Sequence, residues 1–123
     1  MEAIATHLPS VAPISWAVRA GSTLYTVAVP IERDGKFRLG DIDAQAQLAF
    51  ENLRMTLAAA GGSLRDVVQV VVYLTDVADS TAVNRQWEKY FSAPWPNRAI
   101  IGTNALTIPG TKLEMLATAV LQS

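Results

Sequence analysis

The alternation of apolar and polar positions along this chain predicts five strands. Two strands are expected at residues 14–20 and 23–29, joined by a turn at Gly21. Val67–Leu74 is a run of β-branched residues typical of a strand that is buried on both faces. Two further strands are expected at about residues 97–104 and 111–121, joined by a loop that holds Pro109 and Gly110.

Helical spacing of apolar residues predicts a first helix at about residues 44–60. Asp41 or Asp43 can cap its start, because a carboxylate there accepts free backbone N–H groups. Gly61 and Gly62 end it, since glycine readily takes the left-handed conformation of a helix end. The expected buried stripe consists of Ile42, Ala46, Ala49, Phe50, Leu53, Leu57 and Ala60.

A second helix is expected to begin at Asp79 or Ser80 and to end before Pro94 and Pro96. Its expected inner stripe is formed by Val83, Trp87, Tyr90 and Phe91. The order ββαβαββ predicts one α+β domain over residues 1–123, with two helices on one face of a mixed sheet and a loose N-terminal arm at residues 1–11. Because the strand Val67–Leu74 is apolar on both faces, something must cover the other face, and self-association is the simplest solution.

Composition excludes several kinds of site. The ten Lys and Arg nearly balance the eleven Asp and Glu, so no basic surface for nucleic acid is expected. There is no cysteine and only one histidine, His7, so we expect no metal site. The first residues do not resemble a secretion signal and no apolar run is long enough to cross a membrane, so we expect a cytoplasmic protein.

An ordered set of segments, rather than one motif, resembles the RidA (YjgF/UK114) family over about residues 12–120. The segments that carry this resemblance are residues 53–66, 70–76, 83–84, 90–91, 96–98 and 113–115. The resemblance implies a chorismate-mutase-like fold that forms a homotrimer, with ligand clefts between subunits. It also implies hydrolysis of reactive enamines and imines, such as 2-aminoacrylate, to 2-keto acids and ammonia without metal or organic cofactor.

Two charged residues stand in strands that are otherwise apolar, and we expect them to carry the chemistry. Arg98 offers a planar fork that matches a carboxylate, and the resemblance implies that it binds the carboxylate of the substrate. A hairpin centred near Leu106 would place Glu114 opposite Arg98, in one cleft. The resemblance implies that Glu114 orients or activates water. The competing interpretation is a structural cross-strand ion pair.

Other positions would shape the cleft. The resemblance places Asn84 near the ligand, although an asparagine in a first helical turn can also satisfy backbone groups. The family has a tyrosine where this chain has Ile14, a serine–glycine pair at about Val27 and Ala28, and a cysteine at Ile100. These apolar replacements predict a substrate that is larger or more apolar than 2-aminoacrylate.

The three tryptophans have different expected roles. Trp87 lies at the inner helical spacing and is expected in the core. Trp16 either packs or lines the cleft, and Trp95, between two prolines, is either a loop anchor or a cleft wall.

The sequence therefore predicts a cofactor-independent, deaminase-type hydrolase acting on an enamine or imine conjugated to a carboxylate. A variant of this prediction is a pathway-specific member that performs tautomerisation, dehydration or cyclisation in the same cleft. The alternative is a non-catalytic homotrimer that binds small carboxylates.

Overall fold

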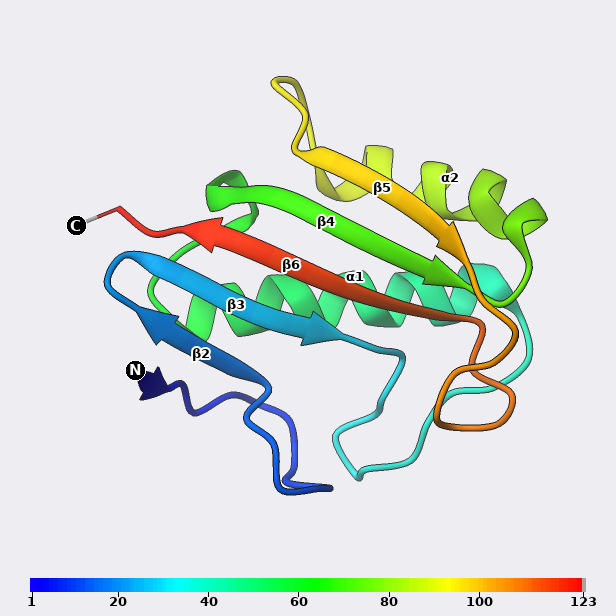
Figure 1. The fold of residues 1–123 in the computed structure, drawn as a ribbon, viewed down its shortest axis with the longest axis horizontal. Coiled ribbons are helices and arrows are strands. Elements are labelled where there is room, and N and C mark those ends of the chain that lie inside the picture. Colours follow the sequence, from blue (N-terminus) through cyan, green and yellow to red (C-terminus); the bar gives the residue numbers. More distant parts are fainter. Residues whose placement is uncertain (123) are drawn as a thin grey trace.

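A computed structural model describes residues 1–122 and contains one six-stranded mixed sheet with two helices on one of its faces (Figure 1). The strands are β1 (Glu2–Ala3), β2 (Ala17–Ala20), β3 (Thr23–Ala28), β4 (Val67–Leu74), β5 (Asn97–Gly102) and β6 (Leu113–Val120). The helices are α1 (Ile42–Ala59) and α2 (Ser80–Tyr90), with short 3₁₀ turns η1 (Leu64–Asp66) and η2 (Val77–Asp79). The spatial order β1-β2-β3-β6-β4-β5 confirms the predicted α+β class.

The ends of α1 follow from local chemistry. The carboxylate of Asp41 accepts a hydrogen bond from the backbone N–H of Ala44, at 3.1 Å, and so caps the first turn. After the helix, Gly61 takes a φ of 82°, which the absence of a Cβ makes inexpensive. Of the two predicted candidates, Asp41 and Asp43, the cap is therefore Asp41.

The main core lies between the helices and the sheet. Val70 and Val72 of β4 and Met115 of β6 are fully buried there. Phe50 of α1 stacks on Tyr90, with ring centroids 5.4 Å apart, and meets Trp87 edge-on at 6.2 Å. The prediction that Trp87 is a core residue is confirmed.

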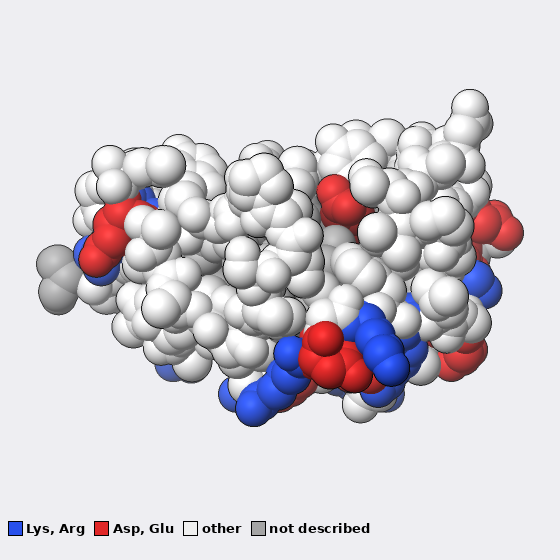
Figure 2. All heavy atoms as spheres, turned by 90° about the horizontal axis from the view of Figure 1, so that it is seen from below, with Lys and Arg blue, Asp and Glu red and all other residues white. Residues whose placement is uncertain are grey.

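The other face of the sheet is largely apolar and exposed. Tyr25, Leu116 and Val120, whose side chains point away from the helices, are 42–50% exposed. Within residues 1–122 no helix covers this face (Figure 1). Figure 2, which views the molecule from below Figure 1, shows most charged side chains along the lower edge, with others at the two ends and one acidic group among the otherwise uncharged atoms above. The sheet therefore presents the uncovered apolar face that the sequence predicts.

The predicted hairpin of the last two strands is wrong. β5 pairs with β4 in parallel, through the crossover helix α2, while β6 pairs antiparallel with the opposite edge of β4. The chain segment 103–112 therefore carries the chain past β4 instead of turning back on β5. A strand–helix–strand unit such as β4–α2–β5 is the usual way to join parallel strands, and the chain adopts it here in place of the local hairpin.

The N-terminal segment, expected to be a loose arm, follows the sheet. β1 pairs with β2, and the backbone N–H of Ile4 donates to the carbonyl of Ala17. Further along, His7 Nε2 lies 2.9 Å from Asn52 Oδ1, and because that oxygen can only accept, Nε2 donates. Residues 1–11 were expected to form a loose arm. Their contacts with β2 and with Asn52 of α1 show instead that part of this segment is held against the domain.

Asn52 should be a strong determinant of stability. It is 4% exposed, and its Nδ2 donates to the carbonyls of Val29 and Ile31 at 3.0 and 2.9 Å. Asn52→Ala leaves buried polar groups without partners and should lower the free energy of unfolding by about 2–4 kcal/mol in urea titrations. Gln47→Ala, exposed on the same helix, should change it by less than about 0.5 kcal/mol. Equal effects of the two substitutions would contradict the assigned role.

Candidate active site

Arg98 lies on β5 and its side chain points to the helix side of the sheet. It is level with the buried Val70 of β4, and its guanidinium carbon lies 4.7 Å from the centre of the Trp87 ring. Such a cation–π contact holds the planar group against the ring while leaving its edge free to donate. The side chain is half-buried, and this burial lowers the pKa of Arg98, although an arginine stays charged.

No acidic partner neutralises Arg98 among the described residues. The ion pairs found in residues 1–122 are Arg38–Glu32, Arg54–Glu51 and Arg85–Asp43. Beside Arg98 there is an open hollow of about 490 Å³, lined by Asn84, Trp87, Glu88, Trp95, Pro96 and Arg98. A guanidinium with unused donors at the wall of a hollow is suited to bind an anion, and its fork fits a carboxylate best.

Glu114 lies on the opposite face of the sheet. Its neighbours in β6, Leu113 and Met115, are fully buried on the helix side, so strand alternation places Glu114 on the uncovered face. There it is half-buried and level with Tyr73 of β4. The same face contains a second hollow of about 410 Å³, whose lining includes Trp16, Val27 and Leu116.

Arg98 and Glu114 therefore do not share a cleft within one chain. Arg98 is level with Val70 of β4, whereas Glu114 is level with Tyr73, and β4 lies between their strands. From strand spacing and rise, their Cα atoms are about 14 Å apart, with side chains on opposite faces. This corrects the predicted juxtaposition, and it equally excludes the alternative of a cross-strand ion pair inside the chain.

The comparisons with known proteins agree with this fold. The model of the family described as Endoribonuclease L-PSP matches residues 5–121. The chain belongs to the RidA family. The crystal structure of RidA from the Antarctic bacterium Psychrobacter sp. superposes with a TM-score of 0.90 at 33% identity, covering 98% of this chain and 100% of that chain.

Two other similar proteins give information on a ligand or an activity of their own. The structure of Escherichia coli TdcF with bound serine has a TM-score of 0.90 at 28% identity and covers 99% of this chain and 100% of its own. A 2-iminobutanoate/2-iminopropanoate deaminase from Dermatophagoides farinae is 30% identical over 99 residues, which are 78% of this chain and 77% of the relative.

The remaining predicted site residues of this RidA-family chain fall into separate groups. Ile100 is on the same face as Arg98 and packs against the main core. Val27 and Trp16 both line the hollow on the uncovered face. Trp16 also packs there, since it is 8% exposed and its indole N–H donates to the carbonyl of Pro9. Ala28 is 1% exposed in the core, so its side chain cannot line a cleft, contrary to the prediction. Ile14 is half-exposed ahead of β2 and lines neither hollow.

Asn84 lines the hollow beside Arg98, and the structure adds Glu88 to this lining. The sequence analysis missed Glu88, although the spacing of four residues from Asn84 places both on one side of α2. Trp95, whose role the sequence left open, also lines this hollow.

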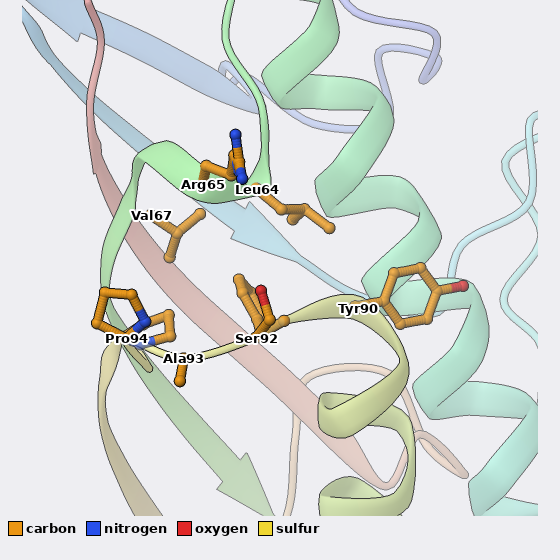
Figure 3. Close-up of a pocket in the computed structure, with 9 residues that line it drawn as sticks. Leu64, Arg65, Val67, Tyr90, Ser92, Ala93 and Pro94 are labelled. Atoms are coloured by element: carbon orange, nitrogen blue, oxygen red, sulfur yellow. The ribbon is translucent and has the colours of Figure 1, made fainter.

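A smaller hollow of about 280 Å³ lies elsewhere and holds none of the predicted site residues. Figure 3 shows it between the η1 turn and the segment that leaves α2. Its lining is Leu64, Arg65, Val67, Tyr90, Phe91, Ser92, Ala93, Pro94 and Pro96. Arg65 is the only charged side chain in this lining and it is exposed, so this hollow is a weaker candidate than the one beside Arg98.

Within the described part of the chain, no helix is long and apolar enough to cross a membrane.

The described residues also contain no group of three or more metal-ligating side chains. Dialysis against EDTA should therefore leave the melting temperature and any turnover unchanged. A fall in either quantity that zinc restores would contradict this prediction.

Proposed function

We propose that this RidA-family protein hydrolyses an imine or enamine conjugated to a carboxylate, without a cofactor. In the imine form, the oxygen of water is added to the C=N carbon and the nitrogen leaves as ammonia, which gives a 2-keto acid. The observation that carries the proposal is the half-buried Arg98 guanidinium, held on Trp87 without an acidic partner and lining an open hollow.

In this proposal Arg98 binds the substrate carboxylate through two parallel hydrogen bonds, and Asn84 contributes a polar contact from α2. Glu114 orients or activates water. Since Glu114 lies on the other face of its own sheet, the Glu114 that serves a given Arg98 comes from a neighbouring copy. The uncovered apolar face supplies the reason for copies to associate, as a homotrimer with clefts between subunits.

The named relatives support the same class of ligand. Serine, bound in E. coli TdcF, is an α-amino acid with a carboxylate, and the D. farinae relative is named for the deamination of 2-imino acids. We extend that chemistry to this chain because its Arg98 presents a guanidinium with unused donors at the wall of an open hollow, which suits a carboxylate.

A specific observation favours a second candidate, a non-catalytic trimer that binds small carboxylates. Ile14 and Ile100 stand where the family has a tyrosine and a cysteine, so polar groups of the typical cleft are replaced by apolar ones. A cleft with these replacements is also compatible with tautomerisation, dehydration or cyclisation in place of hydrolysis. Turnover by the wild-type protein separates the binder from the enzyme, and the products identify the reaction. The cytoplasmic location stays a prediction.

Assembly is the first test. Light scattering should give a mass of about three copies of the 13.2 kDa chain. Leu116→Lys, which places a charge on the uncovered face, should lower this mass, because burying an unpaired ammonium is costly. Ala58→Lys, exposed on α1, is the matched control and should leave it unchanged. A wild-type monomer at micromolar concentration would refute the assembly.

The second test measures turnover and thermal unfolding on the same variants. Arg98→Lys keeps the charge but cannot make two parallel bonds, so kcat/KM should fall about 30- to 1000-fold. Glu114→Gln removes the acid–base group and should lower kcat by about 100-fold or more while ligand still binds. Glu2→Gln, an exposed carboxylate on β1, is the control for charge removal.

In both active-site variants the melting temperature should stay close to that of the wild type. If activity instead follows the folded fraction, the two side chains are structural. Normal turnover by folded Glu114→Gln protein would remove the acid–base assignment.

A further inference from the structure

Trp95 is an exposed aromatic side chain that lines the same hollow as Arg98. It is 52% exposed, although tryptophan is a large apolar residue that proteins usually bury extensively. The aromatic contacts of this region join Phe50, Trp87, Tyr90 and Phe91 to one another and do not include Trp95. The ring of Trp95 is therefore available for another planar group.

The flanking prolines restrict the backbone around Trp95. Pro94 and Pro96 stand on either side of it, and each proline ring fixes the backbone φ angle at its own position. Pro96 itself lines the hollow, two residues before Arg98. A backbone that is already restricted loses less conformational entropy when a ligand binds against Trp95.

The hollow is larger than a three-carbon acid requires. In a single chain the open hollow has a volume of about 490 Å³, which leaves room for more than three carbon atoms beside Arg98. A carboxylate on Arg98 fixes one end of the ligand and leaves the rest of it among Trp87, Trp95 and Pro96. The hollow also includes the polar Asn84 and Glu88, so an apolar part of the ligand should lie on the side of Trp95 and Pro96.

We propose that Trp95 is a specificity-determining residue, and that the site takes 2-imino and 2-keto acids with a planar, apolar side group that stacks on its indole. The inference rests on the proposed carboxylate contact at Arg98, and it adds which kind of side group the bound acid carries. An exposed tryptophan has one main rival role, as an anchor between copies of the chain, and the experiment separates the two.

The test measures binding of stable keto acids to the intact protein by calorimetry. Phenylpyruvate should bind more tightly than pyruvate or 4-methyl-2-oxopentanoate, a branched aliphatic acid. Trp95→Ala should weaken phenylpyruvate binding by about 2- to 12-fold, the range of an aromatic pair, and change pyruvate binding by less than about twofold. Trp95→Phe, which keeps a planar apolar ring, should retain most of the preference. Light scattering on each variant should give the wild-type mass.

Each other outcome overturns a defined part of the proposal. If Trp95→Ala affects pyruvate and phenylpyruvate equally, or neither, Trp95 is not a specificity residue, and the proposed function stands. If the aliphatic acid binds as tightly as phenylpyruvate, the preference is for apolar area and not for a planar group. A lower mass of Trp95→Ala protein would make Trp95 an interface anchor. If none of the acids binds the wild type, the carboxylate site and the specificity inference both fail.

Discussion

The structure depends on one constraint, the pairing of β4 with β5 on one edge and with β6 on the other. Neighbouring residues in paired strands share a face, and successive residues alternate, so this pairing assigns every side chain of the three strands to one side of the sheet. Arg98 is assigned to the helix side and Glu114 to the uncovered side. A reaction that needs both groups must then be assembled from two copies of the chain, which would link catalysis to the covering of the apolar face.

The same pairing joins the candidate site to the main core. Trp87 is 6% exposed, meets Phe50 in the core and supports the guanidinium of Arg98. One tryptophan thus fixes α2 on the sheet and the arginine at the sheet edge. Any change that loosens the packing of α2 should also displace Arg98, so stability and ligand binding are expected to vary together at this position.

A different set of contacts orders the N-terminal segment. Asn52 of α1 holds the carbonyls of Val29 and Ile31 directly after β3, and His7 holds Asn52 in turn. Val29 and Ile31 form a small second core with Trp16. The N-terminal segment is therefore held against α1 and the segment after β3 by buried polar groups as well as by apolar area.

The sequence by itself determined the helices, most of the strands and the uncovered apolar face, because these depend on local periodicity and on caps such as Asp41. It also singled out Arg98, because a charge in an apolar strand is visible in the sequence, while Asn84 was named from the family resemblance; the two line one hollow. Only the tertiary structure decided which strands are neighbours. A hairpin of the last two strands and a crossover through α2 satisfy the same apolar pattern, and they differ only in non-local packing. That choice separated Glu114 from Arg98. The burial of Ala28, the order of the N-terminal segment and the position of Trp95 at the hollow likewise depend on contacts between segments far apart in the chain.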